Sequence, residues 1–340
     1  MTAPVLVTGA AGFIGAAVSE RLLVDGVSVI GIDNLNDYYD PALKRARLLR
    51  VQRACSDADW RFLELDVADG QAISQLFESE KPRAVVHLAA QAGVRYSLDN
   101  PGAYLQSNLI GFGHILEGCR HQGVEHLVYA SSSSVYGGNR NLPFTETQAV
   151  NHPVSLYAAT KKANELMAHT YSHLYSLPAT GLRFFTVYGP WGRPDMAPML
   201  FAKAILSGNP IRVFNYGNMS RDFTFIDDIV EGVIRVLNKP ASASQKFDPA
   251  TPDPATSWAP HRIFNIGNSA PMPLLKFIAA LEKSLGREAI KEFQPMQKGD
   301  VQATAADTGL LEKWVGFRPT TSVAQGVDEF ALWYRQFYGV

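Results

Sequence analysis

The chain has 340 residues, of which 46% are apolar, and its 31 basic and 32 acidic side chains leave a formal net charge of −1. This length suits two domains that share a cleft, and a net charge so close to zero favours neither nucleic acid nor an anionic membrane as a partner. Cys55 and Cys119 are the only cysteines, and no basic leader or stretch of about 20 apolar residues is present, so we expect a protein of the reducing cytoplasm without a signal peptide, membrane segment or metal site.

A glycine-rich turn follows the first expected strand. Residues 5–8 form an apolar run, Gly9, Gly12 and Gly15 come next, and helical spacing of apolar residues continues to Leu23. Glycines allow a tight turn and a close approach of the backbone to a ligand, and the helix N-terminus points free amide groups at a pyrophosphate. Because the turn lies between a strand and a helix, it predicts a dinucleotide site.

The next expected strand, residues 27–33, ends in Asp33. A carboxylate at this position can accept hydrogen bonds from an adenosine ribose and repels a 2′-phosphate, which favours NAD over NADP. Asp33 could also be a loop carboxylate or a helix cap.

Strands and helices alternate through the first half of the chain. This alternation predicts an α/β fold with a doubly wound parallel sheet of the Rossmann type, whose ligands bind beyond the carboxyl ends of the strands. His87 interrupts an apolar strand, and we expect a hydrogen-bonded core histidine there rather than a catalytic one. Further strands are expected at residues 61–66, 84–88, 125–130 and 180–185, and helices at residues 40–53, 101–119 and 153–175.

Tyr157 and Lys161 lie four residues apart in an expected helix, so they share one face. An ammonium beside a phenol should lower the pKa of the phenol from about 10 toward working pH. A phenol in that state can take a proton from an alcohol and later return it. The spacing alone is weak evidence, because such pairs are common on surface helices.

The composition changes near Thr186, where proline and glycine begin to punctuate short elements. We therefore predict a dinucleotide-binding domain over residues 1–185 and a smaller mixed α/β domain that binds the substrate over residues 186–340. Segments near residues 221–238 and 261–267 are candidates for packing back on the first domain. Residues 241–260 are expected to form a surface loop, and residues 322–338 a closing helix.

Together, the glycine turn, Asp33, the serines before Val135-Tyr136-Gly137 and the Tyr157/Lys161 pair resemble the extended short-chain dehydrogenase/reductases that act on nucleotide sugars. The resemblance covers nearly the full length. Within that superfamily the chain is most similar to the UDP-glucuronate 4-epimerases, on residues 33–39, 87–95, 182–195, 221–228 and 299–301.

The resemblance implies NAD as cofactor, a UDP-sugar as substrate, a homodimer and a catalytic triad of Ser132, Tyr157 and Lys161. Ser132 would hold the sugar O4 while Tyr157 moves the proton, and Lys161 would lower the pKa of Tyr157 and bind the nicotinamide ribose. The serines could instead only cap a strand end. The residues expected to bind NAD are Gly9, Gly12, Phe13, Ile14, Gly15, Asp33, Asn34, Asp66, Val67, Leu88, Ala89, Ala90, Asn108, Tyr157 and Lys161.

Ser133 and Ser134 separate this chain from similar enzymes with other chemistry. Nucleotide-sugar 4,6-dehydratases carry Asp-Glu at these two positions, and UDP-glucuronate decarboxylases keep a Glu before Val-Tyr-Gly. Without an acid/base pair, elimination of water lacks its proton carriers. We therefore expect Ser133, Ser134 and Thr186 to hold the glucuronate carboxylate. The implied reaction is epimerisation at C4 by transient oxidation to a 4-keto sugar, ring rotation and re-reduction.

Arg193 and Arg221 are the expected diphosphate partners, since guanidinium binds phosphate in a bidentate fork. Structural ion pairs with Asp195 or Asp222 are the other interpretation. Asp300 should accept hydrogen bonds from the uridine ribose, although Gln297 stands where UDP-galactose epimerases have an arginine.

Three other functions remain open on the sequence. The first is a UDP-glucose/UDP-galactose 4-epimerase, the second a UDP-glucuronate decarboxylase, and the third a dinucleotide-binding sensor without turnover.

Overall fold

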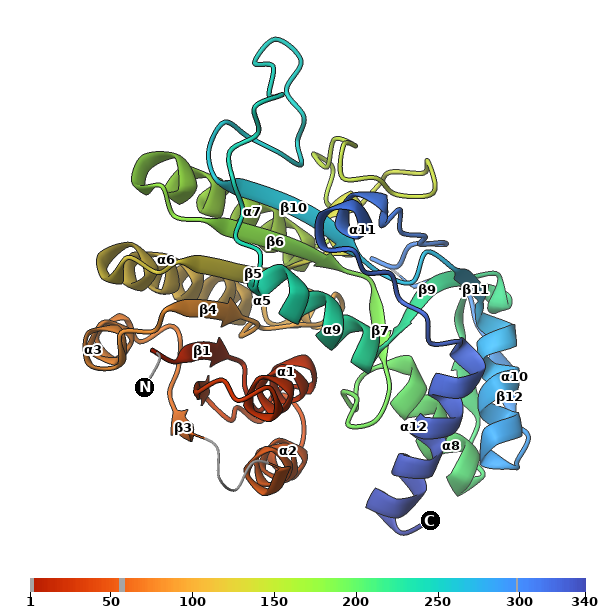
Figure 1. Cartoon of the computed structure of the whole chain (residues 1–340). Helices are drawn as coiled ribbons and strands as arrows, with labels where there is room; N and C mark the ends of the chain where they lie inside the picture. The colour runs from red at the N-terminus through yellow and green to blue at the C-terminus, as the bar shows by residue number, and fades with distance from the viewer. Residues whose placement is uncertain (1–2, 55–58, 298) are drawn as a thin grey trace.

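The computed structural model describes residues 3–54, 59–297 and 299–340 (Figure 1). Its centre is a sheet of seven parallel strands in the order β10-β6-β5-β4-β1-β2-β3. The fold class is therefore the one that the alternation of strands and helices predicts. The strands are β1 (Val5–Thr8), β2 (Val29–Asp33), β3 (Trp60–Glu64), β4 (Ala84–His87), β5 (His126–Ser132), β6 (Ala179–Phe184) and β10 (His261–Ile266).

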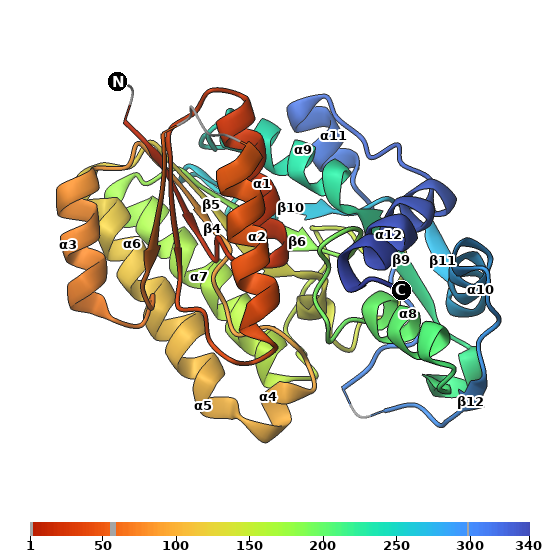
Figure 2. The ribbon, with the colours of Figure 1, turned by 90° about the horizontal axis from the view of Figure 1, so that it is seen from below.

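Helices cover both faces of this sheet, because a parallel sheet must bury both faces (Figure 2). One face packs against α3 (Gly70–Glu80), α6 (Gly111–Gln122) and α7 (Leu156–Tyr175). The other packs against α1 (Phe13–Val24), α2 (Pro41–Ala54) and α9 (Ile226–Leu237).

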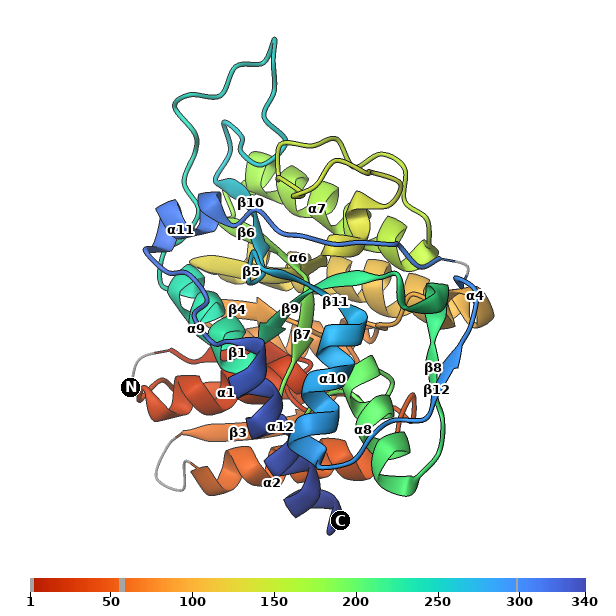
Figure 3. The same ribbon diagram turned by 90° about the vertical axis from the view of Figure 1, so that its right-hand side faces the viewer.

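A smaller group of elements stands beyond the carboxyl ends of the large sheet (Figure 3). Its sheets have the orders β11-β9-β7 and β12-β8. The strands are β7 (Thr186–Tyr188), β8 (Ile211–Val213), β9 (Ser220–Phe225), β11 (Pro271–Pro273) and β12 (Lys291–Phe293), and the helices are α8 (Ala197–Ser207), α10 (Leu274–Leu285) and α12 (Val323–Tyr338). The short helix α11 (Gly309–Val315) packs instead against β10 and α9.

Among the elements after residue 186, β10 belongs to the large sheet and α9 to the layer that covers it. β10 pairs in parallel with β6 at its edge, and α9 packs against α1. They fall in the two stretches that the sequence marked as candidates for packing back. The division of the chain near Thr186 stays a prediction.

The expected helix at residues 101–119 is built from several pieces. α4 (Tyr96–Asp99) and α5 (Pro101–Tyr104) lead into a π-helical segment, η1 (Leu105–Ile110), and then into α6. π-helical turns inside helices frequently occur at functional sites, and this one carries Asn108. The other expected elements differ from the observed ones by a few residues at their ends.

Cys119 is buried in the core, and burial raises the pKa of its thiol, so it behaves as an apolar side chain. Cys55 lies outside the described residues. Within those residues, no helix combines the length and the apolar character needed to cross a membrane.

Candidate active site

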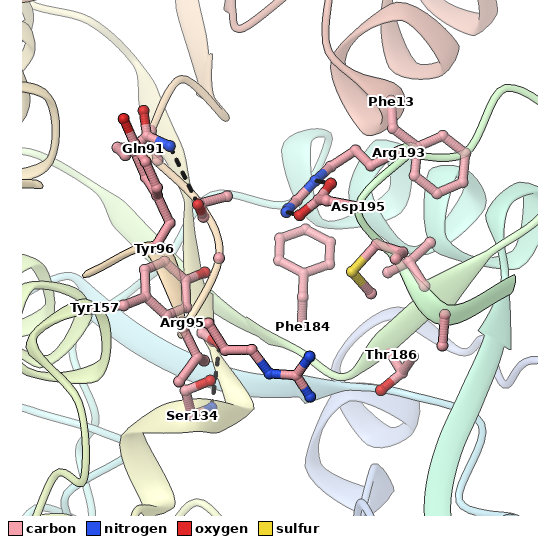
Figure 4. Close-up of a pocket in the computed structure, with 18 of the residues that line it drawn as sticks. Phe13, Gln91, Arg95, Tyr96, Ser134, Tyr157, Phe184, Thr186, Arg193 and Asp195 are labelled. Carbon is pink, nitrogen blue, oxygen red and sulfur yellow. Dashed lines mark hydrogen bonds and ion pairs between the residues drawn. The ribbon is translucent and has the colours of Figure 1, made fainter. Parts of the chain in front are cut away.

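A cavity of about 1020 Å³ lies at the carboxyl ends of the central strands and is closed on its far side by the smaller group of elements (Figure 4). The β1–α1 turn, the segment after β4 and the serines after β5 line one side. Thr186, Arg193, Arg221 and Asp300 line the other. The position agrees with the rule that such sheets bind ligands where their strands end.

The turn between β1 and α1 forms a cradle in which the backbone needs glycine. Gly9 has φ +71°, and a Cβ there would stand 2.8 Å from the Ala89 nitrogen. A Cβ at Gly15 would lie 2.0 Å from the Gly9 carbonyl oxygen. The N-cap of α1, Gly12, has no capping side chain, so the first amide groups of the helix are free to bind an anion. The cradle therefore fits a dinucleotide diphosphate.

Asp33 lines the cavity at the end of β2. Its Oδ1 accepts a hydrogen bond from the Leu35 amide at 2.9 Å and lies 3.6 Å from Lys44 Nζ. The carboxylate thus caps its own turn, as one interpretation of the sequence holds, and it also faces the cavity. An adenosine ribose placed beside it would meet an acceptor, whereas a 2′-phosphate would meet a negative charge.

Nearly all the residues expected to bind NAD line this cavity, and Asn108 is the exception. Asn34 donates to Asp66 Oδ2 at 2.9 Å, which joins the loops after β2 and β3. The Asn108 side chain is buried behind the wall, where it accepts from the Gln91 amide at 2.8 Å and donates to the Gln91 carbonyl at 3.1 Å. Its observed role is to hold the segment after β4 rather than to reach the cavity.

Ser132, Tyr157 and Lys161 all line the cavity, although they come from β5 and α7. Lys161 Nζ donates to the Ala130 carbonyl at 2.8 Å, and Ser132 Oγ accepts from the Ser134 amide at 3.1 Å. The Tyr157 ring meets the Tyr104 ring edge to face, with centroids 6.1 Å apart. The α7 helix begins just before Tyr157 because Ser155 caps it, accepting from the Ala158 amide at 3.1 Å.

The pKa of Tyr157 moves in the direction opposite to the one expected from the sequence. Burial raises it, while a hydrogen bond with Ser132 and the charge of Arg193 act to lower it. Lys161 is itself buried, and burial lowers its pKa to about 8. The expectation that the Lys161 ammonium lowers the pKa of Tyr157 is therefore wrong in its direction, because desolvation acts on both buried groups.

The four consecutive serines divide into two roles. Ser131 Oγ donates to Glu165 at 2.7 Å, beside the buried Arg183–Glu165 ion pair at 2.8 Å, so it belongs to the framework. Ser133 and Ser134 are half-buried and line the cavity together with Ser132 and, on the other side, Thr186 (Figure 4).

Arg193 lies in the cavity paired with Asp195, with its Nε 3.1 Å from Asp195 Oδ1 (Figure 4). Tyr38, from the loop after β2, donates to Asp195 Oδ2 at 3.2 Å. The ion pair weighed from the sequence is thus present. Burial, followed by the Asp195 charge, raises the pKa of Tyr38 to about 12.

Arg221 makes no pair with Asp222. Its guanidinium donates to the carbonyls of Ser220 and Val301 at 2.9 and 2.7 Å, and Asp222 accepts from the amides of Asn268 and Ala306. The positive charge of Arg221 therefore lies at the cavity wall without being balanced by Asp222.

Asp300 pairs with Arg95, whose Nη2 lies 2.9 Å from Asp300 Oδ2. The Arg95 guanidinium also stacks over Phe214 at 4.9 Å. The nearby Gln297 lines the cavity, and its buried Oε1 has no hydrogen-bond partner within the part of the chain that the structure describes.

Sequence reasoning missed Tyr38 and Arg95 as cavity residues. Both lie inside stretches that carry the family resemblance, but their partners are 157 and 205 positions away, and no local pattern indicates such contacts. His87 is the core histidine that was expected: it bonds Thr8 Oγ1 at 2.8 Å, and burial lowers its pKa to about 3. Among the described residues, no three His, Cys, Asp or Glu side chains gather in a metal-binding group.

Comparison with known proteins gives a consistent result. The model of the NAD dependent epimerase/dehydratase family matches residues 5–267. The probable UDP-glucuronate 4-epimerase of Rhizobium meliloti (strain 1021) is 46% identical, over 98% of this chain and 97% of its own. UDP-glucuronate 4-epimerase 4 of Arabidopsis thaliana is also 46% identical, over 98% of this chain and 76% of its own.

A solved structure resembles the whole chain. The crystal structure of UDP-glucuronic acid 4-epimerase from Bacillus cereus, in complex with UDP-glucuronic acid and NAD, matches with a TM-score of 0.87 and 30% identity. The match covers 98% of this chain and 100% of that one.

Proposed function

Because the chain belongs to the NAD dependent epimerase/dehydratase family, we propose that it is an NAD-dependent UDP-sugar 4-epimerase that interconverts UDP-glucuronate and UDP-galacturonate. One observation supports this function above the others. Ser132, Tyr157 and Lys161 meet at one cavity, and the two positions that would carry an acid/base pair for elimination are the serines Ser133 and Ser134. The full-length similarity to UDP-glucuronate 4-epimerases supports the same substrate.

The cradle and the segments after β2, β3 and β4 would hold the cofactor. NAD, when bound, accepts a hydride from the sugar C4 and returns it. The amide groups at the start of α1 would bind its diphosphate, Asp33 its adenosine ribose, and Lys161 its nicotinamide ribose. Asp66 and Val67 line the cavity where an adenine can lie.

Proton transfer falls to Tyr157. In its phenolate form, Tyr157 would accept the proton of the C4 hydroxyl when C4 is oxidised, and the resulting phenol would return that proton after the 4-keto sugar has turned over. Ser132 orients O4, and its hydrogen bond with Tyr157, together with the Arg193 charge, lowers the pKa of the phenol against the effect of burial. Re-reduction on the opposite sugar face inverts C4 with no net change in oxidation state.

Ser133, Ser134 and Thr186 are proposed to hold the C5 carboxylate. The 4-keto sugar is a β-keto acid, which loses carbon dioxide when its carboxylate stands perpendicular to the carbonyl plane. Hydroxyl donors from the two sides of the cavity can keep the carboxylate out of that alignment. Holding this group is how an epimerase would avoid acting as a decarboxylase.

Arg193 and Arg221 are proposed to bind the nucleotide diphosphate, and Asp300 the uridine ribose. Arg193 now pairs with Asp195 and would leave it to bind the diphosphate. Asp300 now pairs with Arg95 and would leave it to bind the ribose. Arg221 needs no exchange, since its partners are carbonyls.

We place the chain in the cytoplasm and expect it to form a homodimer. Exposed apolar side chains gather on neighbouring helices, with Leu105 and Ile110 on η1 and Leu166 and Leu174 on α7. Such a surface is typical of a site of association.

The test is to incubate the purified chain with UDP-glucuronate, and separately with UDP-glucose, without added NAD, and to follow C4 inversion by NMR. We expect inversion of UDP-glucuronate. Tyr157→Phe should lower turnover about 10²- to 10⁴-fold, because the proton carrier is lost, while Tyr338→Phe on the exposed end of α12 should leave it unchanged.

The other outcomes identify the competing functions. Equal or better turnover of UDP-glucose would contradict the glucuronate assignment, and a UDP-pentose as the main product would indicate a decarboxylase. Retained NAD without conversion of either sugar would indicate a dinucleotide sensor.

A further inference from the structure

Arg47 is a buried cation behind the dinucleotide cradle. It lies on α2 with 0% of its surface exposed, and its five hydrogen bonds occupy all five N–H groups of the guanidinium. Nε and Nη2 reach the Trp191 carbonyl at 3.0 and 2.7 Å, and Nη2 also reaches the Gly192 carbonyl at 3.1 Å. Nη1 donates to the Ala11 carbonyl at 3.1 Å and to the Tyr39 phenol at 2.6 Å.

One end of this network is the loop that carries Arg193. Trp191 has φ +66°, in the left-handed region that bulky residues rarely adopt, and such a conformation persists only where the surroundings enforce it. The guanidinium of Arg47 donates to the Trp191 carbonyl. The Trp191 ring packs against the rings of Trp333 and Phe337 of α12, with centroids 5.4 and 5.0 Å apart. Since Trp191 is two residues before Arg193, this backbone direction determines where the Arg193 side chain starts.

The other end of the network is the β1–α1 turn. Ala11 lies between Gly9 and Gly12, immediately before the helix whose free amide groups face the diphosphate site. A hydrogen bond to the Ala11 carbonyl fixes the peptide plane that leads into those amides. One guanidinium therefore contacts the backbone of both binding sites.

We propose that Arg47 is a positioning residue that couples the binding of the dinucleotide to the binding of the nucleotide sugar. The inference rests on the proposed function for the identity of the two ligands. A diphosphate on the turn orders the Ala11 peptide, which holds Arg47 in place, and Arg47 in turn holds the loop from which Arg193 reaches the sugar nucleotide. Because coupling between two sites is reciprocal, each ligand should strengthen the binding of the other by the same factor.

The experiment measures this coupling without turnover. The rate at which NAD leaves the folded protein is determined with and without saturating UDP, and UDP binding is measured by calorimetry on NAD-loaded and NAD-stripped protein. In the natural chain we expect UDP to slow NAD release about fivefold or more. In Arg47→Met, which removes the charge, and Arg47→Lys, which keeps it but lacks the fork, the effect should fall below about twofold.

Arg45→Met is the matched control, since Arg45 is an exposed arginine on the same helix. It should show the same coupling as the natural chain, and circular dichroism should confirm that each variant is folded. If Arg47→Met does not fold, Arg47→Lys decides alone.

Coupling of natural size in the folded Arg47 variants would overturn the inference, and so would a natural chain in which UDP binds but leaves NAD release unchanged. Neither result bears on C4 inversion, which the NMR assay decides separately. A natural chain that binds no UDP would overturn both proposals.

Discussion

At the residue scale, the cavity carries hydroxyl groups at Ser133 and Ser134, the two positions where an acid/base pair for elimination of water would need carboxyl groups. Ser133 and Ser134 begin the short 3₁₀ turn after β5, and Thr186 begins β7 on the other side of the cavity. Hydroxyl groups can donate to a carboxylate without carrying a charge that would repel it. The proposed binding of the glucuronate carboxylate depends on this property, which a neutral hexose would not need.

The first prediction concerns the proposed binding of the C5 carboxylate by these hydroxyl groups. Ser133→Ala and Thr186→Val should each raise the fraction of UDP-pentose formed from UDP-glucuronate and weaken binding of this substrate about 10-fold, because each removes one hydrogen bond to a charged group. Product composition by NMR or chromatography and the KM for UDP-glucuronate check this. Ser269→Ala, far along the chain in the turn before β11, serves as the control. Unchanged product composition and KM in both variants would contradict the proposed role.

The residue scale is also where sequence reasoning was least complete. The residues expected at the dinucleotide, which came from the strand–turn–helix pattern and the resemblance, line the cavity except for Asn108, which lies behind the wall. Tyr38 and Arg95 line it too and were not expected. The pKa of Tyr157 could not be predicted from its spacing to Lys161, because it depends on burial by segments distant in sequence and on Arg193.

At the element scale, the segment between β5 and α7 docks onto β10 through a buried carboxyl group. Glu146, with 1% of its surface exposed, accepts from the Asn265 amide at 2.8 Å. Burial raises its pKa to about 7, Arg183 acts to lower it and Asp307 to raise it. The neutral form is therefore favoured in the folded chain over a range where an unfolded chain carries the ionised form.

The second prediction follows from the sign of this shift. A raised pKa in the folded state contributes stability that is complete below about pH 4.5 and is lost as the pH rises through about 7. Glu146→Gln cannot ionise, so its free energy of unfolding relative to the natural chain should improve between pH 5 and pH 8, by an amount on the order of 2–3 kcal/mol.

Urea unfolding at pH 5, 6, 7 and 8 measures this difference. Glu288→Gln, at an exposed position just after α10, is the control for the exchange of a glutamate for a glutamine. A constant offset for Glu146→Gln across the four pH values would contradict the explanation.

Element types were predicted better than element details. The periodicity of the sequence indicated the main strands and helices of the large sheet, since that signal is local. The π-helical segment at Leu105–Ile110 left no such signal, because it depends on the tertiary contacts of Asn108 with Gln91 and Thr160.

At the scale of the whole molecule, the exposed apolar side chains of η1 and α7 form a surface without a partner in the described chain. Leu166 is 59% exposed, although it lies on α7, which packs against the large sheet, and Leu105 on the neighbouring η1 is 44% exposed. Burying such a surface against a second copy would remove apolar area from water.

The third prediction is that Leu166→Glu shifts the protein toward a monomer. A charge in the centre of an apolar contact costs free energy only when the contact forms, so the monomer should fold normally. Size-exclusion chromatography with light scattering should report twice the 37.2 kDa chain mass for the natural protein and about 37.2 kDa for the variant. Val24→Glu, at the exposed end of α1, should remain dimeric. A natural chain that is monomeric would contradict the proposed dimer.

The overall architecture was predictable because the parallel sheet and its helices repeat one local pattern. The contacts that assemble the cavity were not, since they join residues such as Tyr38 and Asp195 that lie 157 positions apart. For these contacts the sequence provided only the resemblance to a family. That resemblance indicates which residues belong to the site but not which residues they contact.

The Arg95–Asp300 pair has a consequence for the exchange of nucleotides on the proposed mode of binding. On the proposed mode of binding, Arg95 and Asp300 separate when they contact parts of the incoming nucleotide, and they pair again when the nucleotide leaves. Asp300, whose side chain is 15% exposed, then has a cationic partner again, while 51% of the Arg95 side chain stays exposed to solvent. We expect this pairing to ease the release of product, because the Asp300 carboxylate regains a counter-charge from the protein as the nucleotide leaves.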